Sequence, residues 1–136
     1  MSNKRILVVE DDPDVRLGYH VLLKAHYYDA FLAVDGVSAV TQAHEHRPDL
    51  IILDLGLPAG DGFMVLDWLK VSTDVSTIPV IVISGRDPHK NRERAIEAGV
   101  KVFLQKPWND DELLATIDQL VGSPDSSISQ TCAGSS

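Results

Sequence analysis

Short apolar runs alternate with longer stretches of helical periodicity five times along the chain. A run of about four to eight apolar residues between turn residues is typical of a strand buried in a sheet. Apolar residues spaced three and four apart are typical of a helix with one buried face. These patterns predict strands over residues 5–9, 29–33, 50–54, 80–83 and 100–104, each followed by a helix.

The predicted helices are marked by their ends as well as by their apolar residues. Pro13 suits the first turn of a helix, and Asn109 is a good N-cap for the last one. Gly99 is the expected stop of a polar helix over about 88–98. Strand–helix alternation of this kind indicates a doubly wound (βα)5 α/β fold. We expect a five-stranded parallel sheet in the order 2-1-3-4-5, with helices on both faces.

Length and composition bound the rest of the chain. The 136 residues suffice for one domain, which we place at 1–121. Residues 122–136 are rich in serine and poor in large apolar residues, which predicts a disordered tail or the start of a linker. The single cysteine, Cys132, favours a reducing, cytoplasmic setting.

Charge and hydropathy exclude two kinds of partner. We find no apolar run long enough for a membrane span, and we expect no signal peptide and no membrane contact. The net charge of −8 argues against direct binding of nucleic acid, which depends on clustered Lys and Arg. The expected partners are therefore proteins.

Polar side chains at four of the predicted strand ends would meet at one edge of the sheet. Residues 10–12 (Glu-Asp-Asp) follow the first strand, Asp54 ends the third, Ser84 follows the fourth, and Lys106 follows the fifth. Strands one and three are neighbours at the switch point of this fold, which brings the first acids close to Asp54. Two like charges about 4 Å apart repel by about 4 kcal/mol at an intermediate dielectric constant. The cluster therefore needs counter-charges, for which Lys106 and a divalent cation such as Mg²⁺, a binder of oxygen ligands, are the candidates.

A carboxylate beside Mg²⁺, with a hydroxyl and an ammonium nearby, is the equipment for phosphoryl transfer. Asp54 would be the nucleophile, Lys106 would offset charge on the phosphoryl oxygens, and Ser84 would donate a hydrogen bond to the acyl phosphate. Each feature alone is weak, because a strand-end acid is commonly a turn or cap residue. Their placement at one edge makes the combined signal strong.

Several short blocks share their residues, order and spacing with one known family. They are 6–13 (ILVVEDDP), 48–58 (PDLIILDLGLP), 60–62 (GDG), 79–84 (PVIVIS), 97–99 (EAG) and 103–107 (FLQKP). By these blocks the chain resembles the receiver domain of bacterial two-component response regulators over residues 4 to about 121. The resemblance implies the flavodoxin-like fold of that family.

The resemblance also implies a phosphorylation chemistry. Asp54 would accept a phosphoryl group from a phosphohistidine on a sensor histidine kinase or a histidine phosphotransfer protein. Asp11, Asp54 and the backbone carbonyl of Gly56 would ligate Mg²⁺, with Glu10 acting through water. Glu10 stands where many members have Asp, a variation that functional receivers tolerate.

The remaining implied roles concern the switch. Ser84 and Lys106 would contact the phosphate, and the Lys106–Pro107 bond would be cis. Phe103 takes the place of the aromatic residue that turns inward after phosphorylation. The face of the fourth helix, fifth strand and fifth helix would then control a downstream protein or a fused output domain. A phosphorylation-dependent homodimer through this face stays open.

This reading makes the chain a signalling switch that catalyses its own phosphorylation and autodephosphorylation, not an enzyme for an external substrate. The alternative is a Mg²⁺-dependent phosphohydrolase of the aspartyl-phosphate type. Such enzymes place a second Asp two residues after the nucleophile, where this chain has Gly56. A flavin or nucleotide binder would need a Gly-rich or Ser/Thr-rich loop after the first strand, where acids stand instead.

Four further residues carry weaker expectations. Trp68 and Trp108 are expected to be packing residues. His44 and His46 lie two apart, which does not place them on one helical face, so a solvated surface is favoured over a metal site.

Overall fold

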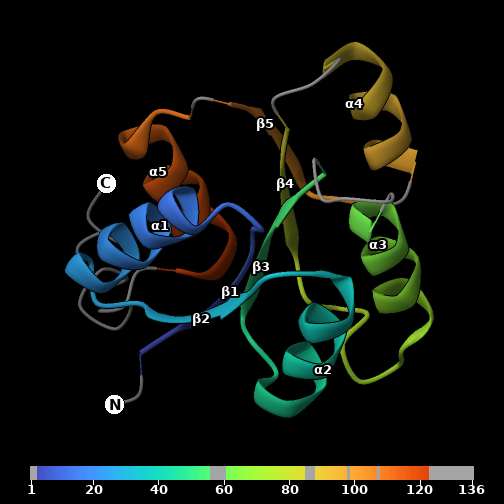
Figure 1. Cartoon of the computed structure of the whole chain (residues 1–136), viewed down its shortest axis with the longest axis horizontal. Helices are drawn as coiled ribbons and strands as arrows, with labels where there is room; N and C mark the ends of the chain where they lie inside the picture. The colour runs from blue at the N-terminus through green and yellow to red at the C-terminus, as the bar shows by residue number, and fades with distance from the viewer. Residues whose placement is uncertain (1–2, 56–60, 85–87, 98, 107, 123–136) are drawn as a thin grey trace, which may run out of the picture.

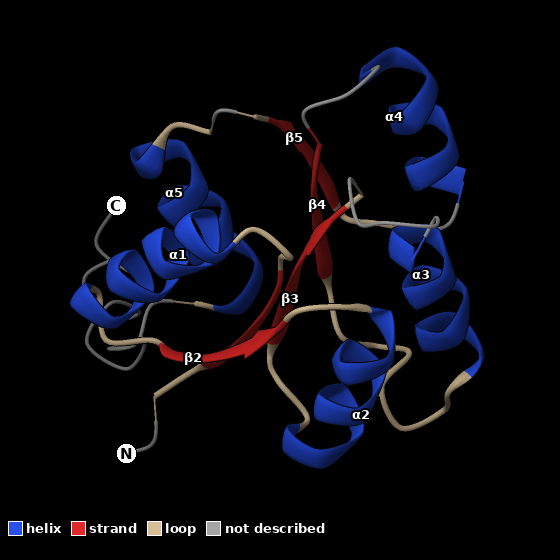
Figure 2. Cartoon of the chain, viewed as in Figure 1, coloured by secondary structure: helices blue, strands red, loops and turns tan. Residues whose placement is uncertain are grey.

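Strands and helices alternate along the chain (Figures 1 and 2). The computed structural model describes residues 3–55, 61–84, 88–97, 99–106 and 108–122, without the side chains of 61, 84 and 88–92. In these ranges the strands are β1 (Arg5–Val9), β2 (Asp29–Ala33), β3 (Leu50–Asp54), β4 (Val80–Ser84) and β5 (Val102–Gln105). The helices are α1 (Pro13–Ala25), α2 (Gly36–His46), α3 (Asp61–Val71), α4 (Pro88–Glu97) and α5 (Asp110–Val121).

The sheet has the predicted topology. Its strands are parallel and lie in the order β2-β1-β3-β4-β5, which confirms the doubly wound α/β prediction. Val9 of β1 lies beside Leu53 of β3, and Leu53 lies beside Val82 of β4. The carboxyl ends of the central strands therefore meet at one edge of the sheet.

Helices cover both faces of the sheet. Figure 1 shows α1 and α5 on one side and α2, α3 and α4 on the other. The four apolar residues of β3, Leu50–Leu53, are each at most 1% exposed, as expected for a central strand buried on both sides.

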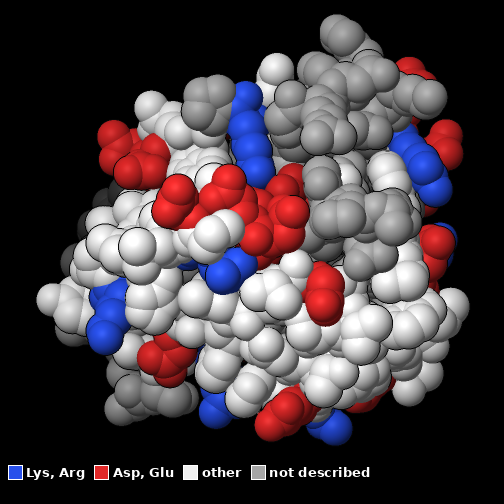
Figure 3. Space-filling view, in the orientation of Figure 1, with Lys and Arg blue, Asp and Glu red and all other residues white. Residues whose placement is uncertain are grey.

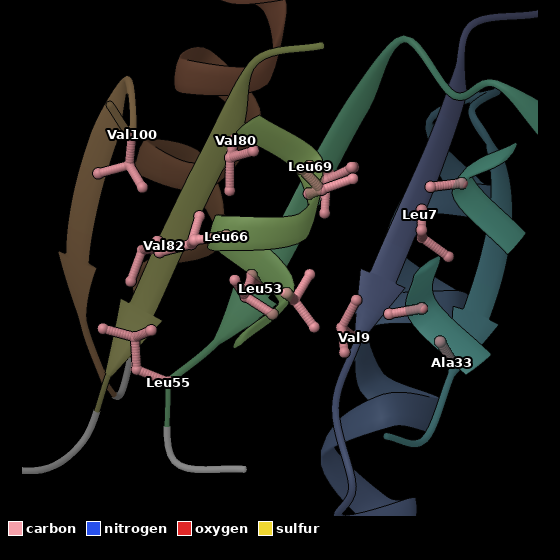
Figure 4. Packing of buried hydrophobic residues seen from close by; sticks show 14 of the residues in the cluster. Leu7, Val9, Ala33, Leu53, Leu55, Leu66, Leu69, Val80, Val82 and Val100 are labelled. Atoms are coloured by element: carbon pink, nitrogen blue, oxygen red, sulfur yellow. The ribbon is translucent and has the colours of Figure 1, made fainter. Parts of the chain in front are cut away.

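Two apolar clusters lie on the two faces, because successive side chains of a strand point to opposite sides. One, between the sheet and α1 and α5, contains Ile6, Val8 and Ile52 among others. The other contains Leu66 and Leu69 of α3, which point toward the sheet in Figure 4. Burying one such side chain contributes about 1.5–3 kcal/mol to the stability of the fold. The two clusters therefore determine which side chains of each strand point to each face of the sheet.

The helix ends follow the sequence signals. The Asp12 side chain caps α1 by accepting from the N–H groups of Asp14 and Val15, and Asn109 caps α5 by accepting from Glu112 N–H. Gly99 follows α4 with a φ of +92°, a left-handed conformation that suits glycine. The Pro13, Asn109 and Gly99 predictions are confirmed.

Two expectations need correction. The last strand begins at Val102 and not at residue 100, because the Val100 N–H bonds back to the Ala95 carbonyl at 3.2 Å and closes the end of α4. Trp68 is 44% exposed on α3, so its prediction as a packing residue is wrong. Trp108 does pack, stacked on Tyr19 with ring centroids 4.3 Å apart. The predicted tail beyond α5 lies outside the described residues from 123 onward.

Candidate functional site

Three charged side chains lie on the side of the sheet that α1 and α5 cover. Their direction follows from the alternation of side chains along β1, along β3 and along the segment that continues β5. Glu10 continues the alternation of Ile6 and Val8, and Asp54 that of Ile52. Lys106 follows Leu104, which packs on the same cluster. All three residues lie at the edge of the sheet that is formed by the carboxyl ends of the strands.

The Lys106 ammonium joins the two buried acids. Its Nζ lies 2.8 Å from Glu10 Oε1 and 3.0 Å from Asp54 Oδ2. Glu10 is 1% exposed and Asp54 is 5% exposed, so these are ion pairs largely withdrawn from water. The convergence of Glu10, Asp54 and Lys106 expected from the sequence is thus present in the structure.

Asp11 completes an acidic cluster at the surface. Oxygen atoms of Glu10, Asp11 and Asp54 all lie within 4.8 Å of one another, and Asp11 is exposed. Figure 3 shows acidic side chains gathered over the turn between β1 and α1. Three carboxylates face the single ammonium of Lys106, and an all-oxygen set with surplus negative charge fits a hard cation such as Mg²⁺.

The pKa values show the cost of this crowding. The pKa of Glu10 is raised from its ordinary value of 4.5 to about 7. Burial is the largest cause, the Asp54 charge adds to it, and the hydrogen bonds from Lys106 and from the Asp12 N–H oppose it. Burial by itself lowers the pKa of Lys106, but its hydrogen bonds to Glu10 and Asp54 outweigh burial and the pKa rises. The lysine therefore stays charged, and Glu10 is the group of this pair that takes up a proton near neutral pH.

Backbone contacts hold the acidic turn. Glu10 Oε2 accepts a hydrogen bond of 3.2 Å from the Asp12 N–H. Nη1 of Arg16 donates to the carbonyl oxygens of Glu10 and Asp11 at 3.0 and 3.3 Å. The sequence reasoning did not identify Arg16, although an arginine one turn inside a helix that follows three acids was the available signal.

The structure describes the remaining expected site residues only in part. Ser84 is the last residue of β4, paired in register with Gln105, and its side chain is not described. Gly56 and Pro107 lie outside the described residues, so the carbonyl ligand and the cis bond stay predictions. Phe103 is half-buried and packs against the cluster on the α2 and α3 side, away from the acids.

The two predicted surface histidines differ in their surroundings. His44 is exposed, and its Nδ1 lies 2.8 Å from Asp74 Oδ2. His46 stacks on Phe31 with ring centroids 4.2 Å apart. Neither belongs to the acidic cluster that could hold a metal ion among the described residues.

An open parallel sheet that carries, at its carboxyl edge, an acidic cluster able to hold a metal ion and a lysine paired with it defines an α/β module suited to anionic ligands and a divalent cation. The family described as the response regulator receiver domain matches residues 6–118, and the chain belongs to this family. It is a signalling switch domain of the kind found in two-component systems.

Curated relatives are regulators of transcription. The chain is 36% identical over 134 residues to the transcriptional regulatory protein PrrA of Mycobacterium tuberculosis, covering 96% of this chain and 57% of PrrA. It is 37% identical over 114 residues to the phosphate regulon transcriptional regulatory protein PhoB of Escherichia coli, covering 84% of this chain and 50% of PhoB. The chain thus spans about half the length of these relatives.

Solved structures agree on the fold. The signal receiver domain of a putative LuxO repressor protein from Vibrio parahaemolyticus is 32% identical, with a TM-score of 0.79, covering 89% of this chain and 91% of that one. The receiver domain of a sensor histidine kinase from Pseudomonas aeruginosa is 29% identical, with a TM-score of 0.81, over 90% and 100%. That structure holds a magnesium ion coordinated in its active-site cleft. In the described part of the present chain, no helix is long and apolar enough to cross a membrane.

Proposed function

We propose that this receiver domain accepts a phosphoryl group on Asp54, in a Mg²⁺-dependent reaction, from a phosphohistidine of a sensor histidine kinase or a histidine phosphotransfer protein. The observation that carries the proposal is the half-buried Lys106 ammonium, 3.0 Å from Asp54 Oδ2 and 2.8 Å from Glu10 Oε1. A lysine fixed at the nucleophile is already placed to meet incoming phosphoryl oxygens.

The chemistry follows from these groups. A carboxylate oxygen of Asp54 bonds to phosphorus while the phosphorus–nitrogen bond to the donor imidazole breaks. The electron pair of that bond stays on the imidazole nitrogen, which takes up a proton and leaves neutral. Lys106 offsets the charge on the phosphoryl oxygens, and Ser84, at the end of β4, would donate to one of them.

The metal site would be formed by Asp11, Asp54 and the carbonyl of Gly56, with Glu10 acting through water. Three carboxylates within 4.8 Å of one another support this set, since their surplus negative charge suits a divalent cation. Bound Mg²⁺ would supply further positive charge for the phosphoryl oxygens.

Phosphorylation would act on partners through the face of α4, β5 and α5, with Ser84 and Phe103 as switch residues. The packing of the described side chains of α4 supports this choice: among those from 93 to 97, Ala95 is the buried one. Arg94 of α4 lies 3.8 Å from the centre of the Phe63 ring of α3, an exposed contact that can be exchanged at small cost. With one buried side chain among the last five residues of the helix, this end of α4 can adopt two positions of similar energy.

The output is a downstream protein or a fused domain that this face controls, with a phosphorylation-dependent homodimer through the same face as one form of control. Relatives about twice as long that regulate transcription support a fused or associated output module. The net charge of −8 on the chain argues against nucleic acid as its own ligand.

The test is intact-mass measurement after incubation with a small acyl-phosphate donor and Mg²⁺. The parent protein should gain one phosphoryl group, and Asp54→Asn should gain none. Asp118→Asn, which removes an exposed carboxylate from α5, is the matched control and should label like the parent. An excess of EDTA should abolish the label. An unlabelled parent, or label that persists in Asp54→Asn, would contradict the proposal.

A further inference from the structure

Arg16 makes contacts that the proposed phosphoryl transfer does not require. It is the fourth residue of α1 and is half-buried. Its Nη1 donates to the Glu10 carbonyl at 3.0 Å and to the Asp11 carbonyl at 3.3 Å. The Arg16 backbone N–H also bonds to the Asp12 carbonyl at 2.9 Å. The side chain and the backbone N–H of Arg16 together bind the carbonyls of all three residues of the acidic turn.

These two carbonyl contacts restrain the backbone on both sides of Asp11. A peptide unit is planar, so fixing the carbonyl of Glu10 fixes the unit before the Asp11 Cα, and fixing the carbonyl of Asp11 fixes the unit after it. The two soft dihedral angles of Asp11 are thereby held. Because the Cβ direction follows from these angles, the guanidinium sets the direction in which the Asp11 side chain leaves the backbone.

Asp11 depends on this restraint more than its neighbours do. Glu10 is held by Lys106 and by the Asp12 N–H, and Asp54 is held by Lys106. Among the described residues no donor binds the Asp11 carboxylate, which is exposed. The backbone is what places this carboxylate within 4.8 Å of the other two.

We propose that Arg16 is a positioning residue of the cation site, which acts by orienting Asp11. This inference rests on the metal site of the proposed function. It makes a prediction opposite to that of simple electrostatics. A guanidinium near the acids repels Mg²⁺, so its removal should tighten Mg²⁺ binding if charge alone matters. If Arg16 positions Asp11, its removal should weaken binding, since loss of a group that orients a metal ligand typically costs about 10–100-fold in affinity.

The experiment is a calorimetric titration with Mg²⁺ of the whole chain and three variants, at a pH of about 8 where Glu10 is ionised. Arg16→Met removes the charge and both hydrogen bonds, and Arg16→Lys keeps the charge without the planar fork. Lys24→Met removes one positive charge from the same helix at an exposed position and is the matched control. Circular dichroism checks that each variant is folded.

We expect Arg16→Met to raise the Kd for Mg²⁺ at least about tenfold. Arg16→Lys should bind Mg²⁺ more weakly than the parent, and Lys24→Met should match the parent. An unchanged or lower Kd for Arg16→Met overturns the inference, as does full recovery in Arg16→Lys. Should Arg16→Met fail to fold, Arg16→Lys decides by the same criterion.

Failure of the wider proposal looks different. A parent that binds no Mg²⁺ overturns both ideas. A parent that binds Mg²⁺ but is not labelled at Asp54 overturns the phosphoryl transfer and leaves the role of Arg16 standing.

Discussion

Replacing Glu10 by glutamine should make the protein more stable at alkaline pH in the absence of metal. Glu10 is almost fully buried, and burial together with the charge of Asp54 raises its pKa from 4.5 to about 7. Between those two values the native protein holds a proton on Glu10 that the unfolded chain has lost. The free energy of unfolding therefore falls as the pH rises through this window, and it levels off above about 7.

The size of the effect follows from the same pKa values. A tenfold change in an acid dissociation constant corresponds to about 1.4 kcal/mol, so a rise from 4.5 to about 7 corresponds to about 3 kcal/mol. Glutamine has nearly the shape of protonated glutamate and does not ionise. Glu10→Gln should thus match the parent below about pH 5 and exceed it by up to about 3 kcal/mol above about pH 8.

Urea unfolding in EDTA, at several pH values across this range, measures the difference directly. Titrating groups that do not contact Glu10 or its partners contribute equally to both proteins and cancel in the comparison. Glu45→Gln, at an exposed position on α2, controls for the loss of one charge and should show no such pH-dependent gain. If the free energy of unfolding of the parent and of Glu10→Gln changed in parallel with pH, ionisation of the buried Glu10 would not destabilise the native state, and the prediction would be refuted.

Three further substitutions test the local packing of two glycines and of one buried hydroxyl. Gly18→Ala should stabilise the protein by about 1 kcal/mol, since a Cβ at this helical position meets no atom within 4 Å. Gly62→Ala should destabilise it by about 1–3 kcal/mol, since its Cβ would lie 2.9 Å from the Leu55 Cα. Thermal unfolding of the two variants should therefore show a higher Tm for Gly18→Ala and a lower Tm for Gly62→Ala. Tyr19→Phe should raise the free energy of urea unfolding by about 1–3 kcal/mol, because the buried Tyr19 hydroxyl has no hydrogen-bond partner among the described residues, and a loss of stability would show that the hydroxyl is satisfied.

Much of the fold was predictable because its signals are local and repeated. Continuous apolar runs such as 50–53 can be buried only between two layers, and the residues between them carry helical spacing. Parallel strands end at one edge, so the meeting of Glu10, Asp54 and Lys106 followed from their positions at strand ends. The start of the last strand was missed by two residues, because a bond from Val100 back into α4 competes with the sheet.

Other features depend on three-dimensional detail that periodicity does not carry. The contact of Arg16 with two carbonyl groups depends on the backbone path of the acidic turn and on the rotamer of the Arg16 side chain. The raised pKa of Glu10 depends on how fully the neighbouring helices exclude water. Trp68 lies close in sequence to two buried residues of α3, Leu66 and Leu69, yet its side chain is exposed. The size and apolar character of tryptophan, on which its expected burial rested, do not say which face of the helix it occupies.

Phe103 and Lys106 belong to one short segment but serve opposite faces of the sheet. Lys106 reaches the acids on the α1 and α5 side, and Phe103 packs on the α2 and α3 side. Any partner that binds the Phe103 side more tightly once Asp54 is phosphorylated must, by thermodynamic reciprocity, favour the phosphorylated state by the same factor. Such a partner would therefore act as an effector of the very modification it reads, and signal strength would depend on its concentration as well as on the donor's.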